Sequence, residues 1–454
     1  MELKNLLQNL PEVKPPVEKK LSFNVKLKWT LIVLIAFFVL ANISLFGLAS
    51  NSLSRFEYLA VILGTDFGSI ISLGIGPIVT ASIILQLLVG SGIVKMDTST
   101  PEGKKFFQGM QKLLVFFFII FEAMIYVLMK GLEAVPGYTA IVIIQLVLGG
   151  ILILFMDEVC SKWGFGSGVS LFIAAGVGWR LFAGLFGFLD AQAHFSASGA
   201  VIRLVVGLMN SDSQGVMLAL AAILSTVILF LIIVWAQSLK IEIPLSYDRL
   251  RGYTMKWPLQ FFYASNLPVI LVAALMSNMI LFGGILQNYV GHATILGNVV
   301  NGRAESGFLY WISSTDIVST VITGGWRWIL LGQTLGHIIF YMTFAALFSV
   351  FWIKTSGMDA SSQARNILNS GLQIPGFRKD KRILESILNR YVMPLTIMGG
   401  LAIGLLAASA DVLGTITGGT SLLLGIMIIF QFYQNIGQQH AMDMNPAMKK
   451  LMGK

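Results

Sequence analysis

RFEYLAVILGTDFGSIISLGIGPIVTASIILQLLVGSGIVKM, residues 55–96, places a short apolar stub directly before a longer apolar run. The stub, 56–63, has eight residues. A helix of that length measures about 12 Å, whereas the hydrocarbon core of a bilayer is about 30 Å thick, so the stub cannot span a membrane. The run from Ile70 to Val94 has no charged residue and is long enough to span.

The start of that longer run is expected to be irregular. Gly76 and Pro77 can place the proline in a first helical turn, where its missing N–H does no harm. Lipid cannot satisfy free backbone N–H and C=O groups, so a half-helix followed by a full span is typical of backbone that faces a cavity. The pattern predicts a chain that encloses a pore or a vestibule.

Composition identifies a polytopic membrane protein, because 56% of the 454 residues are hydrophobic and 12% are charged. The single cysteine, Cys160, excludes an internal disulfide, and no Cys/His spacing indicates a metal site. Ten spans are predicted, at 29–48, 71–91, 112–130, 139–156, 167–188, 216–236, 258–283, 329–352, 391–409 and 412–433.

The distribution of the 31 Lys and Arg residues predicts the orientation. Most of them fall on the side of the N-terminus, which is therefore expected to be cytoplasmic, with the C-terminus on the same side. The net charge of +9 is then a property of one face, which can meet anionic lipid head groups or RNA.

The chain divides into two halves with projecting loops. Leu3, Leu6, Leu7 and Leu10 recur at helical spacing, which favours an amphipathic helix on the cytoplasmic membrane face, with a disordered tail as the alternative. The predicted regions are a cytoplasmic N-terminal segment 1–28, a first half 29–190, an outer connection 191–215, a second half 216–436 with cytoplasmic loops about 237–257 and 353–390, and a cytoplasmic tail 437–454. The first of these loops alternates apolar and polar residues, which indicates a hairpin. Residues 284–328 are expected to form a partly ordered outer loop.

Two local similarities suggest duplication. GPIVTAS at 76–82 resembles LPVILVA at 267–273, and GVSLFI at 168–173 resembles GTSLLL at 419–424. Because each half has five spans, the copies would run in opposite directions about an axis in the membrane plane. The alternative is that proline and small residues are simply common in membrane helices.

Ionisable groups are scarce inside the spans. Glu122, Arg180 and His337 alone lie away from span ends, and we interpret Glu122 and His337 as packing or interface residues and Arg180 as facing an outer funnel. An inverted-repeat solute transporter, the main alternative, would need more polar groups at mid-membrane. P-loop, HExxH and G-x-S-x-G patterns are absent, which argues against an intramembrane hydrolase and means that a partner must supply the energy.

Five segments in order then resemble the SecY family of protein-conducting channels, in its archaeal branch. They cover essentially the whole chain: LGIGPIVTASIILQLLVGSG at 73–92, IEIPLSYDRLRGY at 241–253, SNLPVILVAAL at 265–275, IPGFRKDKR at 374–382 and GGTSLLLGIMIIFQF at 418–432. The resemblance implies an all-α clamshell of ten helices in two inverted halves around an hourglass pore, with no enzymatic activity and no cofactor.

Site residues follow from the same resemblance. A ring of aliphatic side chains would close the pore waist, because such a ring can shed water yet part around any passing chain. The ring is expected at Ile75, Val79, Val169, Ile173, Ile270 and Leu424. Val79 would then lie opposite Ile270, and Ile173 opposite Leu424. A short plug helix at about 55–66 would cover the outer side, with Phe56, Tyr58, Leu59, Ile62, Leu63 and Gly64.

Spans 2 and 7 would form a lateral gate through which signal sequences enter lipid. Its uncharged polar residues are Thr80, Ser82, Gln86, Asn266 and Asn278. The two cytoplasmic loops resemble the family's docking site for the ribosome and its rRNA, with the basic residues Arg249, Arg251, Lys256, Arg378, Lys379, Lys381 and Arg382. Other expected partners are a small gamma or E-type clamp subunit, a beta-type subunit, nascent polypeptides and membrane lipids. The expected location is the cell (cytoplasmic) membrane.

Overall fold

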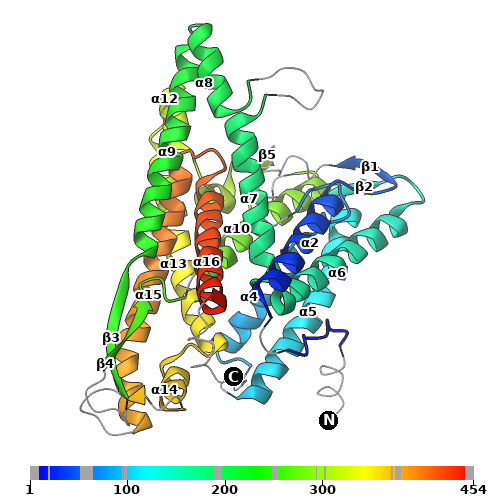
Figure 1. The fold of residues 1–454 in the computed structure, drawn as a ribbon. Helices are drawn as coiled ribbons and strands as arrows, with labels where there is room; N and C mark the ends of the chain where they lie inside the picture. The colour runs from blue at the N-terminus through cyan, green and yellow to red at the C-terminus, as the bar shows by residue number, and fades with distance from the viewer. Residues whose placement is uncertain are drawn as a thin grey trace.

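The long helices of this chain lie side by side in a bundle, as Figure 1 shows for the computed structural model. The structure describes residues 10–18, 21–51, 65–94, 96, 100–188, 197–247, 254–264, 266–292, 294–300, 303–369, 372–373 and 380–444. Within those ranges, nine helices are long and apolar enough to cross a membrane. The helices are α2 (Phe23–Ala41), α4 (Gly76–Gly90), α5 (Pro101–Leu128), α6 (Thr139–Trp163), α7 (Gly168–Phe186), α8 (Ala200–Met209), α9 (Ser213–Gln237), α10 (Leu267–Val290), α11 (Gly307–Ile312), α12 (Ile317–Ile322), α13 (Ile329–Ser356), α14 (Ala360–Asn369), α15 (Lys381–Val412) and α16 (Gly419–Met444).

The predicted helix that begins with Gly76 and Pro77 is confirmed, but it is shorter than the predicted span. Pro77 lies in the first turn of α4, and Ile75 is the residue that caps it. Turns occupy the residues before it, where Gly74 adopts φ +52°, a left-handed conformation that suits glycine. The helix has 15 residues, about 22 Å, so the predicted span 71–91 is only partly helical.

Several helix ends differ from the ends of the predicted spans, because capping residues or strands set them. Helix α5 begins at Pro101 rather than 112, because the Thr100 hydroxyl accepts a hydrogen bond from the Gly103 N–H. Helix α15 begins at Lys381 rather than 391, with the Asp380 carboxylate as its cap. The predicted seventh span, 258–283, starts too early, since its first residues complete a strand. The predicted outer connection 191–215 contains the ten-residue apolar helix α8.

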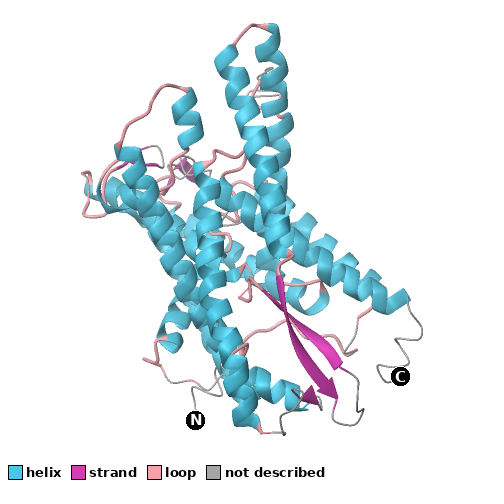
Figure 2. Ribbon diagram, turned by 90° about the vertical axis from the view of Figure 1, so that its left-hand side faces the viewer, coloured by secondary structure: helices cyan, strands magenta, loops and turns pink. Residues whose placement is uncertain are grey.

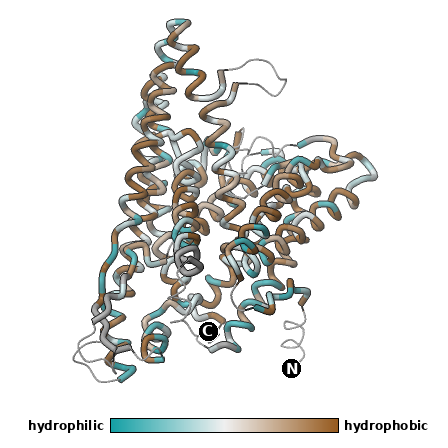
Figure 3. The backbone as a smooth tube through the Cα atoms, viewed as in Figure 1, coloured by the Kyte–Doolittle hydropathy of each residue, from teal (hydrophilic) through white to brown (hydrophobic). Residues whose placement is uncertain are grey.

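Helix α10 lies at the centre of the bundle. Of its most apolar 18 residues, 78% are buried, compared with 11% for α2, which lies at the rim. Helix α10 packs against α4, α13, α15 and α16. Apolar residues run the length of the long helices, and hydrophilic residues gather near their ends and in the connections (Figure 3). The central position of α10 makes its side chains the natural lining of any axial path.

The two predicted loops at one end of the bundle form a single sheet. Strands β3 (Lys240–Tyr247) and β4 (Thr254–Gln260) pair antiparallel, which confirms the predicted hairpin. Strand β7 (Leu372–Gln373), from the second loop, pairs with the outer end of β3. The hairpin and α14 project together from the bundle (Figures 1 and 2). We call the side that carries them the hairpin face.

The opposite face carries short elements. Strands β1 (Leu48–Asn51) and β2 (Leu132–Ala134) pair antiparallel, as do β5 (Val299–Val300) and β6 (Arg303–Ala304). The predicted partly ordered loop 284–328 holds β5, β6, α11 and α12. Helices α8 and α9 pack against each other and project beyond the rest of this face (Figure 1).

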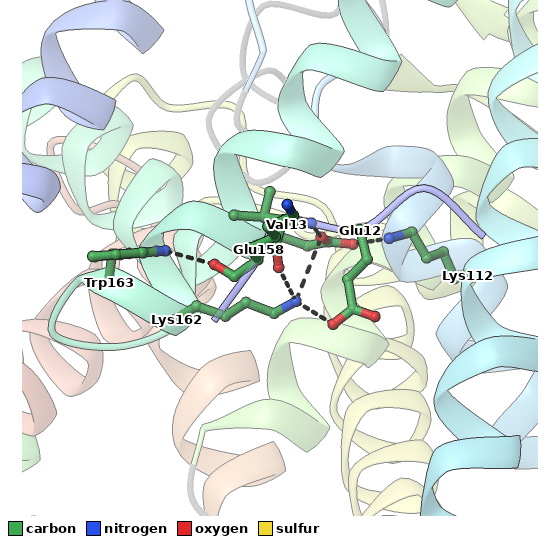
Figure 4. A network of polar contacts seen from close by, with 7 residues as sticks. Glu12, Val13, Lys112, Glu158, Lys162 and Trp163 are labelled. Carbon is green, nitrogen blue, oxygen red and sulfur yellow. Dashed lines mark hydrogen bonds and ion pairs between the residues drawn. The ribbon is translucent and has the colours of Figure 1, made fainter. Parts of the chain in front are cut away.

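The N-terminal segment 10–18 is tied to the end of α6 (Figure 4). The backbone N–H of Val13 donates to Glu158 Oε2 at 2.9 Å, and Lys162 donates to the carbonyl of Val13 at 2.6 Å and to the carboxylate of Glu12. The hydrogen bond from Lys162 lowers the pKa of Glu12, so this contact persists at neutral pH and weakens as the pH falls through the lowered pKa. The predicted amphipathic helix before Leu10 lies outside the described residues.

Each half of the chain contains the same kind of tertiary contact, at equivalent positions. Asp157 Oδ1, on α6, accepts a hydrogen bond from the N–H of Val169, the second residue of α7, at 3.0 Å. Asp411 Oδ1, on α15, accepts one from the N–H of Thr420, the second residue of α16, at 2.6 Å. Val169 and Thr420 occupy equivalent places in the similar segments GVSLFI and GTSLLL. A shared cap on the fifth and tenth spans supports the predicted duplication.

Candidate pore and gate

The predicted ring residues lie inside the bundle, and none of them faces outward. Ile75, Val79, Ile173, Ile270 and Leu424 are each exposed by 3% or less and belong to one continuous apolar cluster. The sixth, Val169, is partly buried and packs against that cluster. The structure therefore brings residues from both halves of the chain into one core.

The helices that carry these residues contact one another in turn. Helix α10 packs against α4 and against α16, and α16 packs against α7. The last of these contacts is close, because a Cβ atom on Gly425 would lie 2.6 Å from Cγ1 of Val177. Branched aliphatic side chains on such a set of helices offer no ligand to ions or water. The arrangement suits a seal.

A chain of polar side chains crosses the seam between α4 and α10. Asn278, on α10, donates to Thr80 Oγ1, on α4, at 3.0 Å. The Thr80 hydroxyl lies 3.1 Å from Glu122 Oε1, on α5, and 2.9 Å from the carbonyl oxygen of Gly76. Glu122 is 1% exposed, and its second oxygen, Oε2, has no hydrogen-bond partner among the described residues.

The sequence interpretation treated Glu122 as a packing or interface residue and did not assign it to the seam between α4 and α10. A carboxyl group in the middle of an apolar span was the signal that could have found it, because such groups are costly and face the bundle interior. Helical spacing gave no indication that α5 contributes to the seam, since the contact depends on how α5 packs against α4.

The other predicted gate residues have different surroundings. Ser82 accepts a hydrogen bond from Gln111 on α5 at 2.7 Å, so its polar contact lies away from α10. Gln86 is buried at 3% exposure, and its side-chain oxygen has no hydrogen-bond partner among the described residues. Asn266 is buried at the start of α10. Of the predicted set, Thr80 and Asn278 are the pair whose hydrogen bond joins the two helices.

The predicted plug residues, Phe56 to Gly64, lie outside the described residues. The segment that follows is fixed in place: the backbone N–H of Ile70 donates to Ile43 O at 2.9 Å, and that of Leu45 donates to Gly68 O at 2.9 Å. These bonds attach the turns that lead into α4 to the segment that follows α2.

The predicted basic site is only partly visible. Arg249, Arg251, Arg378 and Lys379 lie outside the described residues, and Lys256 is placed as a backbone position on β4. Lys381 and Arg382 are exposed in the first turn of α15. Since β3 and β7 pair, the two loops that carry the basic residues belong to one projecting unit.

A second buried polar cluster joins α13, α15 and α16. His337 is fully buried, with Nδ1 2.6 Å from the carbonyl oxygen of Ile312 and Nε2 3.2 Å from Asp411 Oδ2. A carbonyl oxygen can only accept, so Nδ1 must carry a proton. Asp411 also accepts hydrogen bonds from both the N–H and the hydroxyl of Thr420. This cluster agrees with the packing role expected for His337.

Taken together, the fold and the site define an all-helical, multi-span membrane protein with a buried aliphatic cluster drawn from both halves of the chain and a polar contact between α4 and α10. In the described residues no group of His, Cys, Asp or Glu could hold a metal ion. An aliphatic cluster of this kind can serve as the seal of a channel.

Comparisons with known proteins agree. The SecY family model matches residues 69–433. The chain is 42% identical to the protein translocase subunit SecY of Methanothermobacter thermautotrophicus, covering 99% of this chain and 98% of that one. A solved SecY channel, whose plug domain stabilises the closed state and maintains a membrane seal, superimposes with a TM-score of 0.81 at 36% identity, over 97% of this chain and 98% of that one. Sec61 in a canine ribosome-channel complex from the endoplasmic reticulum gives 0.78 at 36% identity, with the same coverage.

The chain belongs to the SecY family. It is the pore-forming subunit of a protein-conducting channel and not an enzyme, which confirms the fold class and the function expected from the sequence. The solute-transporter alternative is not supported.

Proposed function

We propose that Ile75, Val79, Val169, Ile173, Ile270 and Leu424 form the constriction through which an unfolded polypeptide passes. The observation that carries this assignment is the burial of these aliphatic side chains in one core, on four helices that contact one another in turn. A narrow apolar ring dewets and so blocks ions, yet it offers no specific contact that a translocating chain would have to replace.

Crosslinking tests the constriction directly. A photoreactive residue at Ile270 is expected to crosslink a stalled secretory chain, since Ile270 lies on the central helix and is 1% exposed. A probe at Ile144, which is 58% exposed on the outside of α6, is the matched control and should react with lipid. Equal crosslinking of the stalled chain at both positions would contradict the assignment.

Helices α4 and α10 form the lateral gate in this proposal, and the residues around 55–66 form the plug. Support for the gate is the contact between Asn278 and Thr80, which links the two halves with a hydrogen bond that a guest helix can displace at low cost. Support for the plug is its place in the sequence, directly before the anchored turn that leads into α4.

The hairpin face is cytoplasmic in this proposal, with both termini on that side and the opposite face outside the cell. The excess of Lys and Arg in the segments assigned to this face supports the orientation. The proposal places the protein in the cell membrane with a small gamma or E-type clamp subunit and a beta-type subunit as partners, as the family resemblance implies.

The ribosome is the proposed ligand of the hairpin face. Arg249, Arg251, Lys256, Arg378, Lys379, Lys381 and Arg382 would contact rRNA phosphates. The pairing of β3 with β7, which joins the two loops, and the exposure of Lys381 and Arg382 support a single basic docking unit. Sec61 in the canine ribosome-channel complex, which shares this fold, offers a precedent.

Salt dependence tests the docking unit. The affinity of ribosomes for vesicles that contain the channel is expected to fall steeply with salt, and the charge reversals Lys381→Glu and Arg382→Glu should each lower the affinity and reduce the log–log salt slope by about one. Arg203→Glu, on α8 at the opposite face, is the control and should leave both unchanged. A slope unaffected by the first two substitutions would argue for lipid contacts instead.

A further inference from the structure

A second contact closes the seam beside α4, at the end of the helix on the hairpin face. Gly90 is the last residue of α4, and it faces the side chain of Phe351 on α13. A Cβ atom placed on Gly90 would lie 2.5 Å from Cδ1, 2.6 Å from Cγ and 3.0 Å from Cβ of Phe351. A side chain larger than hydrogen fits there only if Phe351 moves aside or α4 and α13 separate.

This contact joins the two halves at a different level from the polar chain. Helix α4 belongs to the first half, and α13 belongs to the second, where it packs against α10. Gly90 follows Thr80 by ten residues, which is about 15 Å along the helix. The seam is therefore held by a hydrogen bond at mid-helix and by an aromatic contact at the end that a cytoplasmic ligand would meet first.

Helix α5 reinforces the same end. A Cβ atom on Gly357, which caps α13, would lie 3.0 Å from Nζ and 3.3 Å from Cε of Lys104 on α5. The last two turns of α13 are thus contacted by α4 at Phe351, and α5 lies close just beyond Ser356. Both elements of the first half that border the seam converge on one helix end of the second.

We infer that the Gly90–Phe351 contact is a latch that keeps the cytoplasmic end of the lateral gate closed and sets how hydrophobic a signal sequence must be to open it. The inference rests on the proposed gate between α4 and α10. An aromatic ring against a glycine has no polar group to leave unpaired when it separates. The latch can therefore yield to any sufficiently apolar segment, which is the selectivity that a signal-reading gate needs.

Export of a series of signal sequences of graded hydrophobicity tests the latch. Gly90→Ala is expected to raise export of the weakest signals about three- to tenfold, because the added methyl group pushes Phe351 away, and to leave the strongest signals unchanged. Phe351→Ala should act in the same direction by removing the contact. Export of weak signals by the double variant should be closer to that of the parent protein than export by Gly90→Ala alone, because alanine at position 351 makes room for the added methyl group.

Gly437→Ala is the matched control, since this glycine is exposed on α16 and a methyl group added to it would meet no atom within 4 Å. It should leave export of every signal unchanged. An unchanged hydrophobicity threshold in Gly90→Ala would overturn the latch. It would also be overturned if Gly90→Ala lost export of weak and strong signals alike and the added substitution Phe351→Ala did not restore it. If substitution of Asn278 shifts the threshold while Gly90→Ala does not, the latch fails and the gate stands; if neither shifts it, the gate itself is wrong.

Discussion

Replacing Asp411 with alanine is expected to lower the free energy of unfolding by about 3–5 kcal/mol. The substitution removes a hydrogen-bond partner from three groups at once: Nε2 of His337 and the N–H and hydroxyl of Thr420. His337 is completely buried, so water cannot replace the lost partner. The cost is therefore that of an orphaned polar cluster rather than of a single hydrogen bond.

Unfolding of the purified protein in mixed detergent and SDS micelles measures this cost. Asp411→Asn keeps an acceptor oxygen for the Thr420 N–H and should recover part of the loss. Asp212→Ala is the matched control, since Asp212 caps α9 at an exposed site, where the loss should be only about 1 kcal/mol. If Asp411→Ala costs no more than Asp212→Ala, the cluster does not stabilise the packing of α13, α15 and α16.

Replacing Asn278 with leucine is expected to make the channel reject weakly hydrophobic signals. The hydrogen bond that is lost to Thr80 is worth ~0.6 kcal/mol, and up to ~1.7 kcal/mol, in membrane helices. Keeping a leucine buried rather than exposed in an opened, hydrated seam is worth about 1.5–3 kcal/mol. The apolar term is the larger, so the closed gate is favoured, and export of the weakest signals should fall by roughly five- to tenfold.

Asn278→Ala separates the effect of the lost hydrogen bond from the effect of the added apolar surface, because it removes the hydrogen bond without adding much apolar area. It should shift the threshold slightly in the opposite direction. Asn210→Leu, the same change at the exposed end of α8, is the control and should leave the threshold unchanged. Identical shifts from Asn278→Ala and Asn278→Leu would contradict this balance and indicate that the seam is sensitive only to loss of the amide.

Much of the architecture could be predicted from the order of residues. Long apolar runs specify spans because the bilayer demands about 20 apolar residues with every backbone group satisfied, and nine described helices meet that requirement. The alternation that predicted the β3–β4 hairpin is equally local. The starts of the helices that extend beyond the predicted spans are also set locally: Thr100 before Pro101 and Asp380 before Lys381 are capping signals that hydropathy ignores.

Only part of the candidate site could be predicted from the sequence, because its contacts depend on how the helices pack. The ring residues came from the resemblance to the SecY family, and the structure places them in or against one apolar cluster. Glu122 was missed as part of the seam, and Ser82 was assigned to it although its polar contact is with Gln111 on α5. Which face of α4 meets α5 and which meets α10 depends on the packing of three helices, and no periodicity within one helix reports that.

The sequence alone indicated that this chain is a membrane protein of two similar halves, with few ionisable residues inside its spans and a basic side, because partition between water and lipid acts on each residue in turn. Tertiary structure alone decided which residues meet: Asn278 with Thr80 and Glu122, Asp411 with His337, and Gly90 with Phe351. Such contacts depend on close packing between segments far apart in the chain, where a shift of a single methyl group decides whether two helices can touch.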